Sequence, residues 1–224
     1  MIASLLLVAL GAPGLPSPAD DAAGGRRDAR PIVAAATIVY GEKSSARCFS
    51  ESFLRLARES SSIPAPEKLA PVALTDPSLA EHPFALLSGE GFFTFAPEER
   101  DALRRFVMNG GFLLASAGCS SAAWDRSLRD ELDEIFPESR LSRIPEDHAV
   151  FSMLVPVASI RLKDGTPAHL EGIDIDGRFG VVYSAAGLND TASLPDCCCC
   201  TGTEVADSPA ILANLFAYAL LAPR

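Results

Sequence analysis

The sequence predicts a three-layer α/β sandwich, in which helices cover both faces of a mostly parallel β-sheet and an antiparallel hairpin forms one edge. Two observations lead to this prediction. Short apolar runs alternate along the chain with segments of helical periodicity, which is typical of parallel strands joined by crossover helices. Later in the chain, residues 170–175 and 179–184 flank Asp176-Gly177, a two-residue turn of the type I′ kind that joins antiparallel strands.

The first half of the domain contains four predicted elements. A continuous apolar stretch over residues 32–40 predicts a strand that is buried on both faces. Residues 50–60 have apolar side chains at helical spacing. Apolar runs at 72–74 and 84–87 end in turns of small or polar residues, as parallel strands do at their carboxyl ends.

The clearest helix begins at Pro97 and ends before Asn109-Gly110-Gly111. Proline suits the first helical position, and acidic residues at the start and basic residues at the end complement the helix dipole. A strand over 112–117, a tight turn and a helix over 122–136 follow. The last helix, over 210–221, is apolar almost all round, so we expect it to pack against the sheet.

Composition restricts the class of protein. The chain has 224 residues, of which 48% are hydrophobic and 21% charged, the balance of an ordinary globular domain. Its 19 Lys and Arg residues against 29 Asp and Glu give a net charge of -10. Because an acidic surface repels phosphate groups, we expect no nucleic acid partner. No apolar run reaches the roughly 18 residues of a bilayer span, so we expect no membrane span in the mature chain.

Residues 1–19 resemble a secretory signal segment. The apolar run over residues 2–10 has the length of a signal's hydrophobic core, and small and proline-rich residues follow it, although no Lys or Arg precedes it. Residues 20–30 form a polar, glycine-containing linker. We therefore expect a single folded domain over 31–224 that is exported to the periplasm or cell envelope.

A set of short motifs follows in order between residues 32 and 221. The motifs are His82-Pro83-Phe84-Ala85-Leu86-Leu87-Ser88-Gly89, Gly91-Phe92-Phe93-Thr94-Phe95, Asn109-Gly110-Gly111-Phe112-Leu113-Leu114-Ala115, Cys119, Trp124-Asp125-Arg126-Ser127, Ile135-Phe136-Pro137, Asp147-His148-Ala149-Val150-Phe151 and Leu170-Glu171-Gly172-Ile173. Together they resemble a bacterial family of domains of unknown function (DUF4159), whose fold is placed among the class I glutamine amidotransferase-like, flavodoxin-like proteins. The resemblance implies a three-layer α/β fold and implies no reaction. Ser116 stands where the family often has an acidic residue, and Glu90 where it often has histidine.

Cys119 lies where glutamine amidotransferases place a nucleophilic cysteine, in the turn between a central strand and the next helix. Backbone N–H groups at a helix start lower the pKa of such a thiol and hold an oxyanion. The corresponding signature has glycine two residues before and two after the nucleophile, where this chain has Ala117 and Ser121. A catalytic pair would use His148 as the base.

The most unusual segment is a run of consecutive cysteines. It consists of Cys197, Cys198, Cys199 and Cys200. Two uses of the run remain open. Three disulfides, including one from Cys48 or Cys119 to the run, suit an exported protein with six cysteines. Alternatively, alternate thiolates of the run together with Cys119 would hold zinc or an iron–sulfur centre, although no CxxC pair supports this site.

Polar residues in the turns after the predicted strands are candidates for ligand binding. These residues are Asp76, Ser88, Glu90 and Ser116. Open α/β sheets bind ligands outside the carboxyl ends of their strands. We therefore expect an envelope module that binds a small-molecule or protein ligand without established catalysis. The alternative is a cysteine-dependent hydrolase or amidotransferase-like enzyme that uses Cys119 and His148.

Overall fold

The computed structural model describes residues 32–40, 43–44, 48–194, 197 and 203–222. The expectations for residues 1–30 lie outside these ranges. The strands are β1 (Ala35–Tyr40), β2 (Lys43–Ser44), β3 (Ala70–Ala73), β4 (Phe84–Gly89), β5 (Phe112–Ala117), β6 (Ser142–Arg143), β7 (Glu171–Ile175) and β8 (Arg178–Ser184). The helices are α1 (Ser52–Ser60), α2 (Pro97–Met108), α3 (Ala122–Ile135) and α4 (Ser208–Leu221), with the short 3-10 turns η1 (Pro77–Glu81), η2 (Gly118–Ser120), η3 (Ala149–Phe151) and η4 (Thr191–Ser193).

The strands form one eight-stranded sheet whose middle is parallel. Its parallel strands lie side by side in the order β3-β1-β4-β5-β8. Numbered as they occur along the chain, this order is 2-1-3-4-5, which is typical of flavodoxin-like folds. β7 and β6 extend the sheet in antiparallel fashion beyond β8, and β2 pairs antiparallel with the end of β1. The predicted α/β class, with a mostly parallel sheet and an antiparallel edge, is confirmed.

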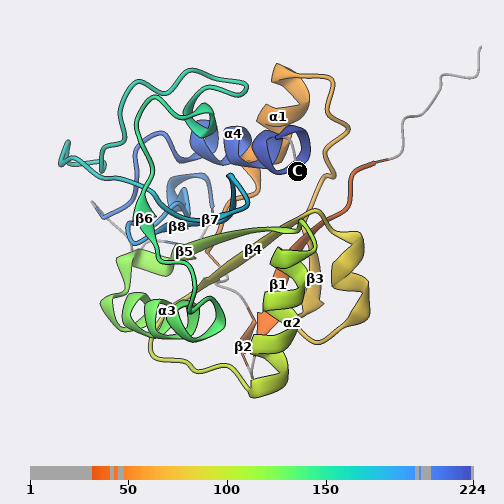
Figure 1. The fold of residues 1–224 in the computed structure, drawn as a ribbon. Coiled ribbons are helices and arrows are strands. Elements are labelled where there is room, and N and C mark those ends of the chain that lie inside the picture. Colours follow the sequence, from red (N-terminus) through yellow and green to blue (C-terminus); the bar gives the residue numbers. More distant parts are fainter. Residues whose placement is uncertain (1–31, 41–42, 45–47, 195–196, 198–202, 223–224) are drawn as a thin grey trace, which may run out of the picture. The chain divides into compact units, whose positions relative to one another are not determined.

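Helices cover both faces of the sheet (Figure 1). α1 and α4 pack on one face, in a core that includes Phe84 and Phe112 from the strands. α2 and α3 pack on the other face, against Ala85, Leu113 and neighbouring residues. Successive residues of a strand point to opposite faces, so one strand supplies both cores. The structure therefore has the three layers that the sequence predicts.

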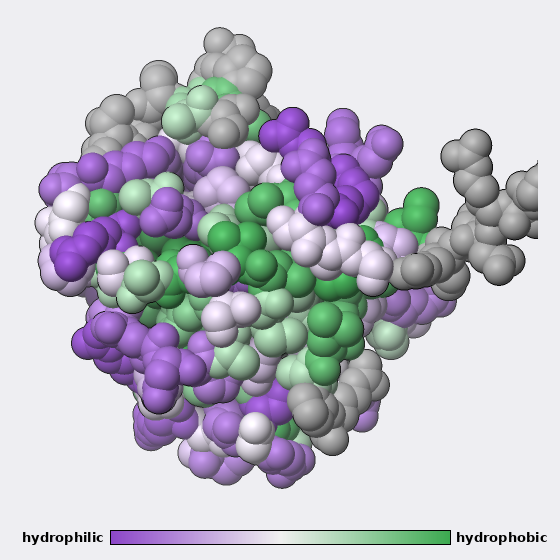
Figure 2. All heavy atoms as spheres, turned by 90° about the horizontal axis from the view of Figure 1, so that it is seen from above, coloured by the Kyte–Doolittle hydropathy of each residue, from purple (hydrophilic) through white to green (hydrophobic). Residues whose placement is uncertain are grey.

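α4 is the apolar helix expected over residues 210–221, and it begins at Ser208. Its buried Asn214 accepts hydrogen bonds from the N–H groups of Leu154 and Val155 at 2.7 and 2.9 Å. Seen from the side of α1 and α4, apolar residues gather in the middle of the face and polar residues surround them (Figure 2). Within the part of the chain that is described, no helix has both the length and the apolar character to cross a bilayer.

The predicted hairpin is confirmed, since β7 and β8 pair antiparallel across Asp176 and Gly177. Both turn residues have positive φ, 55° and 85°, as a type I′ turn requires. β4 extends through Gly89, two residues beyond the predicted strand at 84–87. β2 and β6 have two residues each and were not expected, because so short a pairing has no periodicity.

A buried carboxylate joins α3 to the segment before α2. Glu131 is 3% exposed and accepts hydrogen bonds from the hydroxyl of Thr94 and the N–H of Phe95. Arg100 of α2 forms an ion pair with it at 2.6 Å. Burial alone would raise the pKa of Glu131, but the hydrogen bonds from Arg100, Thr94 and Phe95 lower it overall. The carboxylate therefore stays charged and fixes the two helices relative to each other.

Candidate functional site

The carboxyl ends of β4, β5 and β8 place three serines in a row. Ser88 pairs with Ser116, and Ser116 pairs with Ser184; all three are fully buried. The hydroxyl of Ser116 accepts from the N–H of Leu188 at 3.0 Å, and that of Ser184 donates to the carbonyl of Ala186 at 2.6 Å. Among the described residues, the hydroxyl of Ser88 has no hydrogen-bond partner. An unpartnered buried polar group costs about 1–3 kcal/mol.

Ser88 also lies at the topological switch point of the sheet. β1 connects through α1 to β3 on one side, whereas β4 connects through α2 to β5 on the other. Ligands of open α/β folds bind at such a switch point, outside the carboxyl ends of the strands. The hydroxyl of Tyr40 lies at this point and accepts a hydrogen bond from the indole N–H of Trp124 at 2.9 Å. Burial raises the pKa of Tyr40, so its phenol stays protonated.

The turn after β5 has an unusual backbone. Cys119 and Ser120 both adopt left-handed conformations, with φ of 46° and 52°. Such a conformation costs roughly 1–2 kcal/mol for a residue other than glycine, so other contacts have to stabilise the turn. The hydroxyl of Ser120 supplies two of them, because it donates to the carbonyl of Thr203 at 2.7 Å and accepts from the N–H of Gly187 at 3.2 Å. The turn is thereby joined to two segments that lie far away in the sequence.

Glu90 lies across the same turn. A Cβ atom on Gly118 would lie 2.9 Å from Cγ of Glu90 and 2.9 Å from the carbonyl oxygen of Gly89. Only glycine at position 118 allows this approach. The hydroxyl of Ser121, which caps α3, accepts a hydrogen bond from the N–H of Gly91 at 3.1 Å. The loop after β4 and the turn after β5 therefore form one surface, on which Glu90 is exposed.

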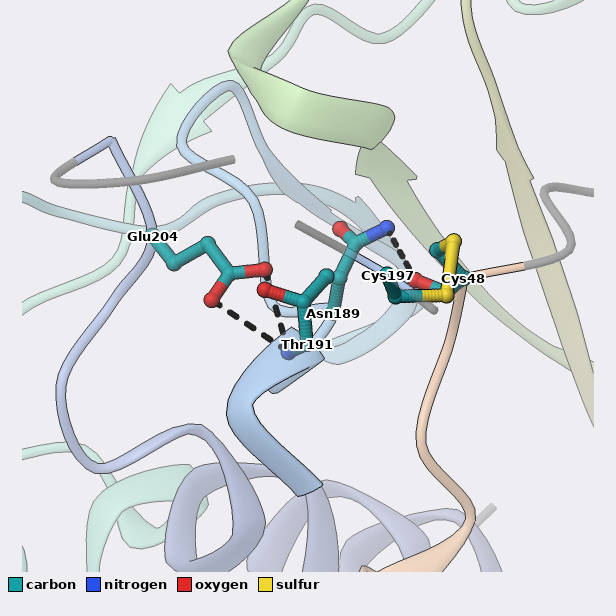
Figure 3. The surroundings of a disulfide bond; sticks show 5 residues. All are labelled: Cys48, Asn189, Thr191, Cys197 and Glu204. Atoms are coloured by element: carbon teal, nitrogen blue, oxygen red, sulfur yellow. Dashed lines mark hydrogen bonds between the residues drawn. A yellow bond between two sulfur atoms is a disulfide. The ribbon is translucent and has the colours of Figure 1, made fainter. Parts of the chain in front are cut away.

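A disulfide joins the β1–α1 connection to the cysteine run (Figure 3). Cys48 is bonded to Cys197, with Cα atoms 5.7 Å apart, which is one of the disulfides that the sequence left open. Asn189 lies beside it: its side-chain amide donates to the carbonyl of Cys48 at 2.8 Å, and its backbone carbonyl accepts from the N–H of Ser50 at 2.8 Å. The Oδ1 atom of the fully buried Asn189 has no hydrogen-bond partner in the described part of the chain.

Cys119 is disulfide-bonded as well. The remaining cysteines of the run, Cys198, Cys199 and Cys200, lie outside the described residues. Within the residues that the structure does describe, no group of three or more His, Cys, Asp and Glu side chains is placed to hold a metal ion. The zinc or iron–sulfur centre at Cys119 and the run stays a prediction.

The structure does not bring His148 to Cys119. The imidazole contacts the rings of Phe179 and Tyr218, with ring centroids 5.0 and 5.6 Å away. Phe179 lies near the start of β8, five residues before Ser184, which ends that strand beside the end of β5. This is roughly 16 Å along the strand. His148 therefore lies at the amino ends of the parallel strands, and Cys119 follows a carboxyl end.

His148 is expected to make the stability of the fold sensitive to acid. Burial lowers the pKa of His148, although Asp147 and Asp174 act in the opposite direction, and its Nδ1 accepts a hydrogen bond from the N–H of Val150 at 3.2 Å, which requires the unprotonated ring nitrogen. Because the folded pKa of His148 lies below the unfolded value of about 6.5, its contribution to the free energy of unfolding is complete above that pH and is lost as the pH falls through the folded pKa.

We expect the melting temperature to fall more steeply below about pH 6.5 in the wild type than in His148→Gln. Parallel pH profiles of the two proteins would contradict this role.

Asp76 lies apart from the row of serines. It caps η1, with Oδ1 accepting a hydrogen bond from the N–H of Ser78 at 2.8 Å. Asp76 lines a cavity at the other end of the strands. The lining of this cavity includes Pro83 and Gly111, which precede β4 and β5. Of the four polar candidates, Ser88, Glu90 and Ser116 thus share the carboxyl edge, and Asp76 does not.

A cavity of about 350 Å³ opens at the end of β8, and we name it the strand-end cavity. It is lined by Ser120, Arg129, Leu162, Pro167, Ala168, His169, Glu171, Ala185, Ala186 and Thr203. Ser120 connects it to the left-handed turn after β5, and Ala185 and Ala186 directly follow β8. The volume falls within the range of sites for small ligands.

A network of charged groups forms the polar end of the strand-end cavity. Arg129 donates to Asp125 at 2.8 Å and to Glu171 at 3.1 Å, and the hydroxyl of Tyr183 donates to Asp125 at 2.6 Å. The hydrogen bonds from Arg129 to Glu171 raise the pKa of Arg129, and burial raises the pKa of Tyr183. Two carboxyl groups, Asp125 and Glu171, therefore share one guanidinium, and of these three groups Arg129 and Glu171 line the cavity.

Several residues of this cavity have no signal in the sequence. Arg129 follows Asp125 by four residues on α3, which predicts an ion pair on a helix surface. Nothing in the spacing predicts that Glu171 of β7 completes it. Thr203 follows the cysteine run and also lines the cavity. A hydrogen bond from Ser120 to its carbonyl holds it there, and this long-range contact has no signal in the sequence.

A family model matches most of the chain. A family model described as a domain of unknown function, DUF4159, matches residues 35–220. The match covers the sheet from β1 to β8 and nearly all of α4. No curated protein matches the sequence.

Proposed function

The chain belongs to the DUF4159 family, and we propose that it is a ligand-binding module of the cell envelope, with its site at the carboxyl edge of the sheet. The observation that carries this proposal is the strand-end cavity. Its position outside the carboxyl ends of parallel strands is where open α/β folds bind ligands. The oxygens of Ser88 and Asn189, which have no hydrogen-bond partner among the described residues, lie along the same edge of the sheet.

The lining of the cavity indicates the class of ligand. Leu162, Pro167, Ala168, Ala185 and Ala186 supply apolar walls. The carboxylate of Glu171, which lines the cavity, favours a head group that is cationic and donates hydrogen bonds. We therefore infer a small ligand with an apolar body and an amine.

The envelope location is part of the proposal and is supported by the cysteines. The disulfide between Cys48 and Cys197 is compatible with an oxidising compartment, where such bonds persist.

The second candidate, a cysteine-dependent hydrolase or amidotransferase-like enzyme, has less support. The left-handed turn at Cys119, between a strand and a helix, suits a nucleophile. Against it, the sulfur of Cys119 is in a disulfide and His148 lies at the other end of the strands. Ligand binding requires neither group to be reactive.

Titration of the oxidised full-length chain with tryptamine tests the proposal, because this probe has an apolar body and an amine. We expect chemical shift changes at the amides of Ala185 and Ala186. Thr203→Trp narrows the cavity from its exposed rim and is expected to weaken binding by about tenfold or more, which corresponds to 1.4 kcal/mol. Ala186→Leu enlarges another lining side chain and is expected to have the same effect.

Thr166→Trp is the matched control, since Thr166 is exposed on the neighbouring segment but does not line the cavity. Its affinity for tryptamine should equal that of the wild type. If tryptamine leaves the amides of Ala185 and Ala186 unchanged, or if Thr203→Trp and Ala186→Leu both bind it as the wild type does, the strand-end cavity is not the binding site.

A further inference from the structure

A second cavity lies outside the carboxyl edge. It has a volume of about 580 Å³ and runs between η1 and the last turns of α2, and we name it the helix groove. Asp76, Glu81 and His82 line one wall, and Arg105 and Asn109 line the other. The groove shares no residue with the strand-end cavity, so it forms a separate site on the molecule.

The floor of the helix groove is apolar. Leu79 and Phe106 contribute to it and are 3% and 8% exposed, respectively. Leu74 and Ala102 lie beside them and are buried as well. The apolar body of a ligand in the groove would therefore contact side chains of the hydrophobic core.

One wall carries a cation that has no partner in the described structure. α2 has arginines at three of its last nine positions, and two of them, Arg100 and Arg104, form ion pairs with Glu131 and Glu138. Arg105 faces the groove and forms no ion pair with a carboxylate of the described residues. Its guanidinium therefore remains available for a carboxylate of a ligand, which it would bind through two parallel hydrogen bonds.

The opposite wall presents acceptors. Hydrogen bonds from the N–H and hydroxyl of Ser78 lower the pKa of Asp76, so its carboxylate is charged. Glu81 adds a second carboxylate to the lining. Nδ1 of His82 lies 2.9 Å from the carbonyl oxygen of Ser78; a carbonyl only accepts, so Nδ1 donates this hydrogen bond.

We propose that the helix groove binds a short peptide with apolar side chains and free termini. The ammonium group would bind the carboxylates of Asp76 and Glu81, the carboxylate would bind Arg105, and the side chains would cover the apolar floor. Opposite charges that line one cavity without pairing with each other favour a ligand that carries both. The volume of about 580 Å³ accommodates a dipeptide.

Titration of the full-length protein with the dipeptide Leu-Leu, followed by amide chemical shifts, tests this site. We expect shifts confined to η1 and the end of α2. N-acetyl-Leu-Leu and Leu-Leu amide each lack one charge and are expected to bind about tenfold or more weakly. In Arg105→Gln, Leu-Leu and Leu-Leu amide should bind equally, and in the double variant Asp76→Asn, Glu81→Gln, Leu-Leu and N-acetyl-Leu-Leu should bind equally.

Arg55→Gln is the matched control, because Arg55 is an exposed arginine of α1, on the other face of the sheet. The Arg55→Gln variant should show the same differences in affinity between Leu-Leu, N-acetyl-Leu-Leu and Leu-Leu amide as the wild type does. If Leu-Leu shifts no amide of η1 or α2, or if Arg105→Gln still prefers the free carboxylate, the proposal is wrong. Thr203→Trp should leave Leu-Leu binding unchanged, so failure of the strand-end site and failure of the groove are distinguishable.

Discussion

Gly89→Ala is expected to lower the free energy of unfolding by about 3 kcal/mol, through overpacking and loss of a buried hydrogen bond. A Cβ atom at this position would lie 2.1 Å from the hydroxyl oxygen of Tyr40 and 2.6 Å from Nε1 of Trp124. Neither neighbour has room to move. Both are buried and hydrogen-bonded to each other, and Phe93 contacts both rings. For a domain of this size the melting temperature should fall by about 10 °C.

Gly91→Ala is the matched control for this prediction. Gly91 has a φ of +73°, but a Cβ atom there would have no neighbour within 4 Å. Its substitution should cost only the backbone strain, about 1 kcal/mol. The double variant Gly89→Ala, Tyr40→Phe removes the nearest clashing atom and should recover part of the loss. A Gly89→Ala protein that melts within a degree of Gly91→Ala would show that β4 ends with more room than the structure indicates.

Cys48→Ser is expected to destabilise the oxidised protein by about 2–4 kcal/mol. The bond from Cys48 to Cys197 spans 149 positions, so its loss allows the unfolded chain far more conformations. In the folded state it also fixes the backbone carbonyl of Cys48, to which Asn189 donates. Urea unfolding of wild type and variant, both oxidised, measures the difference.

Reduction distinguishes the contributions that the disulfides of Cys48 and Cys119 make to stability. Adding a dithiol reductant to Cys48→Ser should cause a further loss of stability, because Cys119 is also disulfide-bonded. In the reduced state, Cys48→Ser and wild type should unfold at the same urea concentration. A Cys48→Ser protein as stable as the oxidised wild type would mean that this bond does not constrain the unfolded chain.

Much of the fold follows from local patterns. α2 is predicted from Pro97, its acidic first turn and the glycines that end it, because each acts on neighbouring backbone groups. The hairpin at Asp176-Gly177 depends on two residues that accept positive φ. Ser88 and Ser116 are predicted at one edge because parallel strands end on the same side of a sheet.

Positions that depend on long-range packing could not be predicted in this way. Asp76 follows a strand, but β3 lies at the outer edge of the sheet and η1 runs back toward the start of β4, so this carboxylate leaves the shared edge. His148 belongs to a long connection whose path is set by contacts with Phe179 and Tyr218. No spacing rule states at which end of the strands such a connection packs.

The position of β8 has a consequence for how the chain acquires its structure during synthesis. β8 lies between β5 and β7 in the sheet, and Phe216 of α4 packs against Phe53 and Phe84. A nascent polypeptide that emerges amino end first therefore lacks a middle strand and a covering helix until residues beyond 216 have left the ribosome. Until then β1, β3, β4 and β5 can pair with one another, but the edge of β5 that binds β8 and the face that α4 covers remain exposed to solvent.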